Sequence, residues 1–189
     1  MRMSSPAPIY YTADMVHELN AAEPRAWPRY ECVYGELLVS PAPRWLHQEI
    51  VLRLARALSA YLDQEPIGRV IISPSDIRFG RKDVLVQPDV SVTPRDAARA
   101  WDWRDVVSLL LAAEVLSPST ERDDRFTKRR AYQSHGVPLY WIVDAEDRHV
   151  EVWTPADELP RFEREQLVWH PDGARTPFVL PLAELFRDA

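Results

Sequence analysis

The sequence predicts a single mixed α/β (α+β) domain in which helices flank a central mixed β-sheet. Candidate strands alternate with two long helices along the 189 residues, and neither an internal repeat nor a linker divides the chain. A continuous apolar run at residues 109–116 suits a strand buried on both faces, so we expect it at the centre of the sheet. We expect residues 1–29 to be a lead-in with a short helix and residues 30–189 to form the domain.

The first part of the chain predicts a short helix, a hairpin and the clearest long helix. Thr12 is a good helix-capping residue and begins a helix that we expect to reach Asn20. Gly35 separates two strand-like runs within residues 29–43, which is typical of a hairpin. Apolar residues recur at helical spacing over residues 46–62 and indicate an amphipathic helix.

The second part predicts short strands around one charged helix. Strand candidates lie at residues 69–72, 75–79, 84–87 and 90–93, and a polar connection with one helical turn, residues 94–107, leads to the apolar strand. A helix over residues 120–135 ends at Gly136, because glycine accepts the left-handed conformation that ends helices. Further strands are expected at residues 139–143 and 149–153, and residues 162–186 should add one or two strands and a short helix.

The composition excludes several classes of protein. With 46% hydrophobic and 28% charged residues and no apolar run long enough to span a membrane, the chain predicts a soluble protein without a membrane partner. We expect no secretory signal, and the single cysteine, Cys32, excludes an internal disulfide framework, so a cytoplasmic location is expected. The net charge of −6 comes from residues 141–189, and the balanced remainder can still carry a local basic surface.

Two carboxylates occupy positions where an acidic residue needs a partner. Asp89 follows Pro88 at a strand edge, and Glu114 lies in the most apolar strand. Asp and Glu are almost never fully buried unless they are paired or bind a metal, and a divalent cation with oxygen ligands resolves their mutual repulsion. The pair therefore indicates a site of the Mg²⁺ type. The alternative is that Glu114 ends its strand in solvent and Asp89 caps a turn.

The charged helix carries a third candidate. Asp124, Lys128 and Tyr132 are spaced i, i+4 and i+8, so they share one helix face. Lys128 is one of two lysines in the chain, and its ammonium could lie beside the carboxylates. The alternative is an ordinary exposed Asp–Lys pair, which contributes about 0.3–0.5 kcal/mol.

Together these residues stand in a pattern that resembles a known family. The pattern consists of EVLSPST at residues 114–120 with Asp124, Lys128 and Tyr132, then GVPLYWIVD at 136–144, preceded by YGELLVSPAP at 34–43, His47 and PDVSV at 88–92. It resembles the Uma-type endonucleases of the PD-(D/E)XK nuclease superfamily. The resemblance implies a restriction-endonuclease-like fold and metal-dependent hydrolysis of phosphodiester bonds in DNA.

The resemblance also implies roles for individual residues. Asp89, Glu114 and the backbone carbonyl of Val115 would hold Mg²⁺ or Mn²⁺, and Lys128 would orient or activate the attacking water. In the superfamily generally, the lysine lies two residues after the second acid, where this chain has Leu116. Catalysis then requires Lys128 to reach the site from the following helix.

Residues with supporting roles are less sharply indicated. Glu36, His47 and Asp124 form a second tier of candidates, each with an ordinary structural alternative. Arg122, Arg125 and Arg129 would contact DNA phosphates if their helix borders the metal site, and otherwise form a solvated helix face. Trp101 and Trp103 are the tryptophans best placed to stack on bases.

Two other interpretations of the function stay open, and the oligomeric state is a separate question. The chain could be a catalytically degenerate domain that keeps the nuclease fold and binds nucleic acid or protein. It could also act on RNA or on a smaller phosphodiester. Exposed strand edges make a homodimer plausible, since two-fold symmetry is the commonest arrangement of oligomers.

Overall fold

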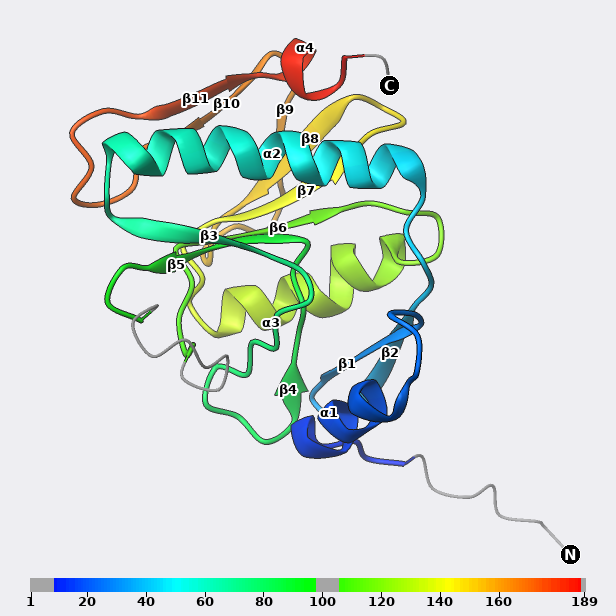
Figure 1. The fold of residues 1–189 in the computed structure, drawn as a ribbon. Coiled ribbons are helices and arrows are strands. Elements are labelled where there is room, and N and C mark those ends of the chain that lie inside the picture. The colour runs from blue at the N-terminus through cyan, green and yellow to red at the C-terminus, as the bar shows by residue number, and fades with distance from the viewer. Residues whose placement is uncertain (1–8, 98–105, 188–189) are drawn as a thin grey trace, which may run out of the picture.

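A mixed six-stranded β-sheet lies at the centre of the computed structural model, which describes residues 9–97 and 106–187 (Figure 1). Its strands, in spatial order, are β3 (Gly68–Ile72), β5 (Val90–Pro94), β6 (Leu111–Val115), β7 (Tyr140–Asp144), β8 (His149–Trp153) and β9 (Arg161–Glu163). Within this sheet β6 and β7 are parallel and the other neighbours are antiparallel. The predicted mixed sheet is confirmed, with the apolar strand β6 well inside it.

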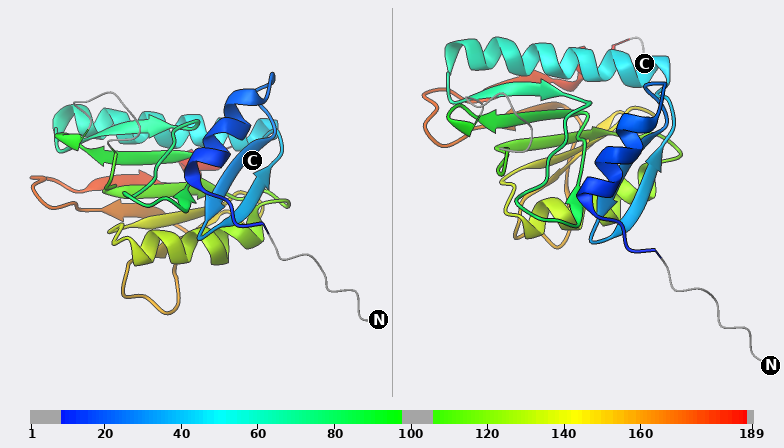
Figure 2. Two further views of the ribbon diagram at one scale, coloured as in Figure 1. Left: turned by 90° about the horizontal axis from the view of Figure 1, so that it is seen from below. Right: turned by 60° about the horizontal axis from the view of Figure 1, so that its bottom comes forward.

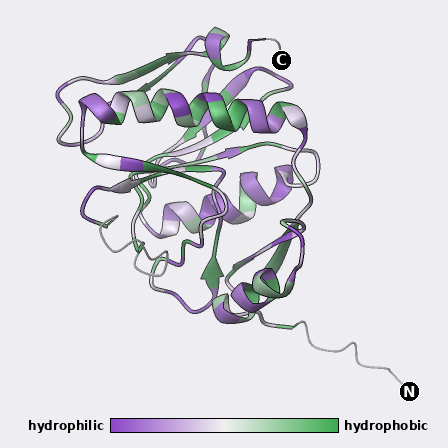
Figure 3. Cartoon of the chain, in the orientation of Figure 1, coloured by the Kyte–Doolittle hydropathy of each residue, from purple (hydrophilic) through white to green (hydrophobic). Residues whose placement is uncertain are grey.

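Helices cover both faces of this sheet (Figures 1 and 2). α2 (Trp45–Gln64) packs on one face through a hydrophobic stripe that includes Ile50, Leu54 and Leu58, and hydrophobic and hydrophilic patches follow each other along it (Figure 3). The other face carries a helix that runs from a π-helical segment, η3 (Asp123–Lys128), into α3 (Arg129–Ser134). This helix is the crossover that the parallel β6–β7 pair requires. None of the helices in the described ranges is long and apolar enough to span a membrane.

Alternation along β6 sends its side chains to opposite faces of the sheet. Ala113 and Val115 join the core beneath α2, whereas Ala112 joins the core that contains Tyr132 of α3. Glu114 therefore points toward the η3–α3 helix. This places an acidic side chain in the interior between the sheet and the charged helix.

The N-terminal part forms a small layer beside the main sheet (Figure 2). It contains a second sheet, β2 (Glu36–Ser40), β1 (Arg29–Val33) and β4 (Val84–Leu85), and α1 (Ala13–Ala22) packs on it. The Thr12 hydroxyl accepts a hydrogen bond from the Met15 N–H at 3.2 Å, which confirms the predicted cap. Gly35, at a φ of +84°, occupies the predicted hairpin turn. The division at residue 29 stays a prediction.

The C-terminal part closes the core next to α2. It consists of the hairpin β10 (Gln166–Trp169) and β11 (Phe178–Pro181) and the short helix α4 (Leu182–Leu185). Trp169 and Phe178 lie near Trp141, with ring centroids 6.5 and 6.1 Å from it. The predicted strands and short final helix of the tail are confirmed, but with β9 the structure has one strand more than the one or two predicted for residues 162–186.

One predicted strand, residues 75–79, is wrong. Ile77 makes a single isolated bridge to Val86, and its neighbours in this segment do not extend the pairing. The side chain of Asp76 instead bonds to Gln87 and His17, and Phe79, at a φ of 50°, turns the chain into the following loop. The alternation of polar and apolar residues in this segment therefore does not indicate a strand, because the polar side chain of Asp76 has tertiary partners. Most of the polar connection at residues 94–107 lies outside the described residues.

Candidate active site

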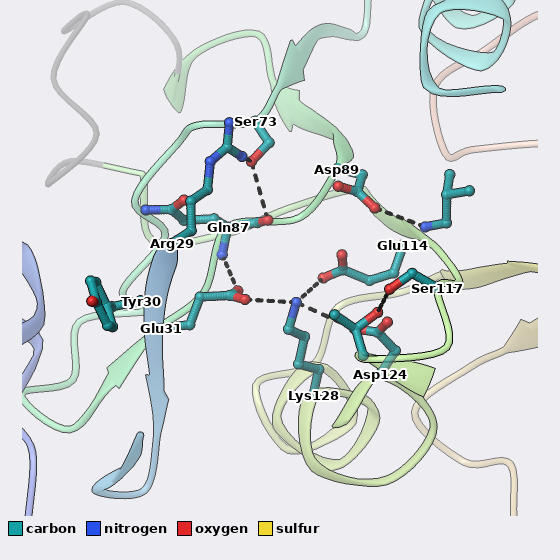
Figure 4. Close-up of polar contacts among 12 residues, drawn as sticks. Arg29, Tyr30, Glu31, Ser73, Gln87, Asp89, Glu114, Ser117, Asp124 and Lys128 are labelled. Atoms are coloured by element: carbon teal, nitrogen blue, oxygen red, sulfur yellow. Dashed lines mark hydrogen bonds and ion pairs between the residues drawn. The ribbon is translucent and has the colours of Figure 1, made fainter. Parts of the chain in front are cut away.

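The centre of the candidate site is a buried lysine. Lys128 is 4% exposed, and its Nζ lies 2.9 Å from Glu31 Oε2, 3.1 Å from Glu114 Oε1 and 3.3 Å from Asp124 Oδ1 (Figure 4). Each of the three acidic residues is at most 3% exposed. One ammonium lies among three acidic side chains, so the cluster carries more acidic than basic groups, and a further cation would favour their ionised forms.

Three separate elements bring these side chains together. Glu31 comes from the small sheet and Glu114 from the central strand β6, while Asp124 and Lys128 face the same way at an i, i+4 spacing in η3. The Tyr132 hydroxyl, one turn further on, donates to Glu114 Oε1 at 3.0 Å. The predicted shared helix face is confirmed, and so is the approach of Lys128 to Glu114. π-Helical turns occur frequently at functional sites.

Asp89 directly precedes β5, and its carboxylate lies next to the end of β6, the strand that carries Glu114. Its Oδ2 accepts a hydrogen bond from the backbone N–H of Val115 at 2.9 Å and one from His47 Nε2 at 3.1 Å. His47 belongs to the first turn of α2, so two elements fix the orientation of this carboxylate. Leu116, at the superfamily's usual lysine position, has its backbone N–H bonded to Val143 in the sheet and its side chain packed on a core cluster.

The protonation states follow from burial and from the lysine. Burial raises the pKa of Glu114 well above its usual range, against the lowering effect of Lys128. Burial would lower the pKa of Lys128, but Glu114, Glu31 and Asp124 outweigh it and raise this pKa. Burial would likewise raise the pKa of Asp89, but the hydrogen bond and charge of His47 lower it. Asp89 is therefore ionised at neutral pH and Lys128 is charged.

These groups line one pocket with a volume of about 290 Å³. Trp27, Arg29 and Ser73 line another part of it, and the loop after β6, at residues 117–120, adds three hydroxyl-bearing side chains. The Arg29 guanidinium donates to the Ser73 hydroxyl and lies 4.0 Å from the centre of the Trp27 ring. The pocket is thus lined by a basic and an aromatic side chain, Arg29 and Trp27, on one part and by the acidic side chains on another.

The donor set fits a hard divalent cation. Hydrogen bonds from the described residues to Asp89 reach Oδ2, and those to Glu114 reach Oε1, which leaves Oδ1 and Oε2 for another ligand. Carboxylate oxygens and a backbone carbonyl are the ligands that Mg²⁺ and Mn²⁺ prefer. Asp89, Glu114 and the Val115 carbonyl supply that chemistry, since all three residues line the pocket.

The second-tier candidates divide between the pocket and the surface. His47 and Asp124 line the pocket, as that prediction requires. Glu36 does not: it is exposed at the turn end of β2, outside the residues that line this pocket, and the acidic group from the hairpin is Glu31. Both residues point to the same face of the hairpin, but Glu31 lies two residues further along it from the turn, so only its carboxylate reaches Lys128.

The arginines of the charged helix differ in their surroundings. Arg122 is exposed, whereas Arg125 contacts Glu121, Asp144 and Glu151. Arg129 lies 4.5 Å from the centre of the Trp153 ring. DNA contact by Arg122, Arg125 and Arg129 stays a prediction. Trp101 and Trp103 lie outside the described residues.

Glu31 is the residue that sequence reasoning missed. It lies between Tyr30 and Cys32 in a strand-like run. A charged residue in such a run usually faces solvent, so the sequence offers little reason to expect a buried ion pair. In the structure its Oε1 accepts a hydrogen bond from the Gln87 backbone N–H at 2.6 Å while its Oε2 faces Lys128. Glu31 thereby links the small sheet to the pocket.

Comparisons with known proteins identify the family and the fold of the chain. The model of the Uma2 family, described as "Putative restriction endonuclease", matches residues 15–183. A crystal structure of a putative nuclease of the DUF820 group from Anabaena variabilis ATCC 29413 superposes with a TM-score of 0.75 at 21% sequence identity, over 93% of this chain and 97% of that one. None of the curated proteins compared with the chain matches it. The chain shares the fold of that structure and belongs to the Uma2 family.

Proposed function

We propose that this protein is an endonuclease that hydrolyses phosphodiester bonds in DNA with the help of Mg²⁺ or Mn²⁺. The observation that carries the proposal is the buried ammonium of Lys128, 3.1 Å from Glu114 in a pocket that Asp89 also lines. The family and the fold support the reaction class. The sequence departs from the superfamily at Leu116, and Lys128 supplies a lysine to the same pocket from the following helix.

Asp89, Glu114 and the Val115 carbonyl would hold the ion. When bound, it lowers the pKa of a coordinated water and stabilises charge on the scissile phosphate. The hydrogen bonds from His47 and the Val115 N–H fix the carboxylate of Asp89, so its remaining oxygen is oriented before substrate arrives. This preorganisation reduces the reorganisation needed during the reaction.

Lys128 acts on the reacting groups in this proposal. Its ammonium carries three N–H donors and donates one to Glu114. Glu31 and Asp124 lie within 3.3 Å of it, so one of these two ion pairs would give up a donor to the attacking water or to the negative charge that builds up on the phosphate. The Tyr132 hydroxyl shares Glu114 Oε1 with Lys128 and positions that carboxylate. Because this donor is a neutral hydroxyl, it fixes the Glu114 carboxylate without adding a further charge to the pocket.

Arg29 is the residue best placed to receive a DNA phosphate. Its guanidinium lines the pocket beside Trp27, and a guanidinium binds phosphate oxygens in a bidentate manner. We also propose that exposed Arg122 contacts the backbone further from the reacting bond. Both contacts predict binding that weakens as salt is raised.

The test is cleavage of plasmid DNA by the full chain with Mg²⁺ or Mn²⁺ added in increasing amounts. We expect cleavage by the wild type to require the ion and to fall at least about 100-fold in Glu114→Gln. Glu36→Gln is the matched control, because it removes the same charge outside the pocket and should leave cleavage intact. Cleavage that persists in Glu114→Gln, or that survives complete chelation of metal, would refute the proposal.

A second candidate function is DNA binding without hydrolysis. The observation that favours it is Leu116 at the usual lysine position, together with the three carboxylates that already hold Lys128. Fluorescence anisotropy with labelled DNA distinguishes the two. Salt-sensitive binding by a wild type that cleaves neither DNA nor RNA with either ion would favour the binding domain.

Two further proposals concern the location of the protein in the cell and its oligomeric state. We infer a cytoplasmic location, because the single cysteine of the sequence, Cys32, is free and buried, whereas small secreted domains commonly depend on disulfides. We also infer a homodimer, because β3 is an edge strand of the main sheet and edge strands pair readily. Light scattering after size-exclusion chromatography tests the dimer, and a monomeric mass would reject it.

A further inference from the structure

A histidine outside the pocket is buried without any hydrogen bond from the described residues. His149, the first residue of β8, is 3% exposed, and both of its ring nitrogens are buried and lack a partner among those residues. A neutral imidazole carries one N–H donor and one acceptor nitrogen. Burying both unsatisfied costs free energy, and such a group needs an explanation such as a bound ion.

Two carboxylates lie next to this imidazole. Asp144, the last residue of β7, pairs directly with His149 across the antiparallel strands, and Asp147 lies in the turn between them. One ligand atom from each of the three residues lies within 4.8 Å of the other two. Ligands about 2.1 Å from a shared ion are roughly 3.4 Å apart, and exposed Asp147 has the freedom to close that gap.

The carboxylate of Asp144 is already oriented. Its Oδ1 accepts the backbone N–H groups of Glu146 at 3.1 Å and Asp147 at 3.0 Å, and its Oδ2 accepts Arg125 Nη2 at 3.0 Å. Each carboxylate oxygen has two lone pairs, so both lone pairs of Oδ1 are used and Oδ2 keeps one for an ion. Its neighbour Arg125 also contacts Glu121 and Glu151.

The local charge favours a cation. Arg125 offers one positive charge to three carboxylates, and Asp147 and Glu146 add two acidic side chains in the turn. Arg164 brings a second positive charge, since its guanidinium donates to the Asp147 backbone carbonyl at 3.4 Å, and the acidic groups still outnumber the two arginines. The turn also borders a cavity of about 240 Å³, lined by residues 144–147 and by Ser117 and Pro118. Asp144 and Asp147 line this cavity, so an ion bound to their carboxylates has space for a water ligand, and His149 lies outside the lining.

We propose that Asp144, Asp147 and His149 bind a zinc-class divalent ion that fixes the β7–β8 turn. One imidazole and two carboxylates suit Zn²⁺ and Co²⁺, whereas Mg²⁺ prefers oxygen ligands alone. The ion would join the end of β7, the turn and the start of β8. None of the three ligands lines the Asp89–Glu114 pocket, although Ser117 and Pro118 border both that pocket and the cavity beside the turn. The proposal does not depend on nuclease activity.

The test is titration of the metal-free full chain with Zn²⁺ and Co²⁺, followed by calorimetry, Co²⁺ absorption and thermal unfolding. It uses an Asp89→Asn background, so that binding in the candidate active site is weakened. We expect one equivalent to bind and to raise the melting temperature. We expect affinity to fall at least about 10-fold in Asp147→Asn and binding to be lost in His149→Gln.

Glu146→Gln is the matched control, since it removes a charge from the same turn without removing a proposed ligand. It should bind like its parent. Asp147 is exposed, so its variant should fold even if His149→Gln does not. The absence of a bound equivalent would overturn the proposal. So would binding that Asp147→Asn leaves unchanged, or that Glu146→Gln weakens just as much.

Discussion

Lys128 and Arg125 lie three residues apart on one helix, and each contacts three carboxylates. The Lys128 side chain is 5% exposed and borders the pocket of Asp89, whereas that of Arg125 is 24% exposed and lies against the β7–β8 turn. Each nitrogen of the guanidinium points to a different carboxylate, which is the geometry of a structural clamp. The Lys128 ammonium is a single point charge held among carboxylates that line the pocket. The same ratio of charges thus occurs in two different surroundings, one at the pocket and one at the β7–β8 turn.

The largest expected effect on stability is at Lys128. Lys128→Met leaves three buried carboxylates without their cation, so we expect the free energy of unfolding to fall by about 3–5 kcal/mol. Lys82→Met, the matched change at the other lysine, is exposed and should stay within about 0.5 kcal/mol of the wild type. Urea unfolding at neutral pH measures both. Equal stability of the two variants would show that Lys128 does not stabilise these carboxylates.

Arg125→Met should cost less, because part of this side chain already faces solvent. We expect a loss of about 1–3 kcal/mol from the broken charged hydrogen bonds, with DNA affinity unchanged. Urea unfolding and anisotropy with labelled DNA measure the two quantities. Loss of DNA affinity with stability intact would instead support the sequence-based prediction that Arg125 contacts phosphate.

Neutralising a carboxylate should partly restore the stability lost at Lys128. In Lys128→Met combined with Glu114→Gln, one buried charge fewer is left uncompensated. We expect the double variant to be more stable than the sum of the two single changes predicts, by about 0.5–3 kcal/mol. A double-mutant cycle from urea unfolding gives this coupling, and strict additivity would mean that the two groups do not interact.

The smallest effect is a pH dependence from Asp124. Burial raises the pKa of this carboxyl from 3.8 to about 6, so the native state binds the proton more tightly than the unfolded state. Its contribution to stability is present at low pH and is lost as the pH rises from about 4 to about 6. The stability of the wild type relative to Asp124→Asn should therefore fall over this range. A difference that is constant with pH, or that rises, would contradict the assignment.

The sequence was informative where a local pattern decides the outcome. The i, i+4, i+8 spacing of Asp124, Lys128 and Tyr132 depends only on helix geometry, and alternation along the apolar strand aims Glu114 at that helix. Glu31 could not be found this way, because its role depends on how the small sheet docks against the main one. The choice of Glu36 failed for the same reason.

The same limit applies to His149. Its place at the start of a strand was predictable, but its unsatisfied nitrogens and its cross-strand partner Asp144 appear only when both strands and their turn are in place. The false strand at residues 75–79 shows the converse. A local pattern predicted strand pairing there, but the Asp76 carboxylate instead forms tertiary hydrogen bonds with Gln87 and His17.

The most direct test of the central claim is the cleavage rate with DNA in single turnover, compared between wild type, Lys128→Met and Lys82→Met under conditions where all three are folded. If Lys128 serves the reaction from the helix, its variant should cleave at least about 100-fold more slowly while its DNA affinity changes little, and Lys82→Met should match the wild type. Cleavage at the wild-type rate by folded Lys128→Met would contradict the account.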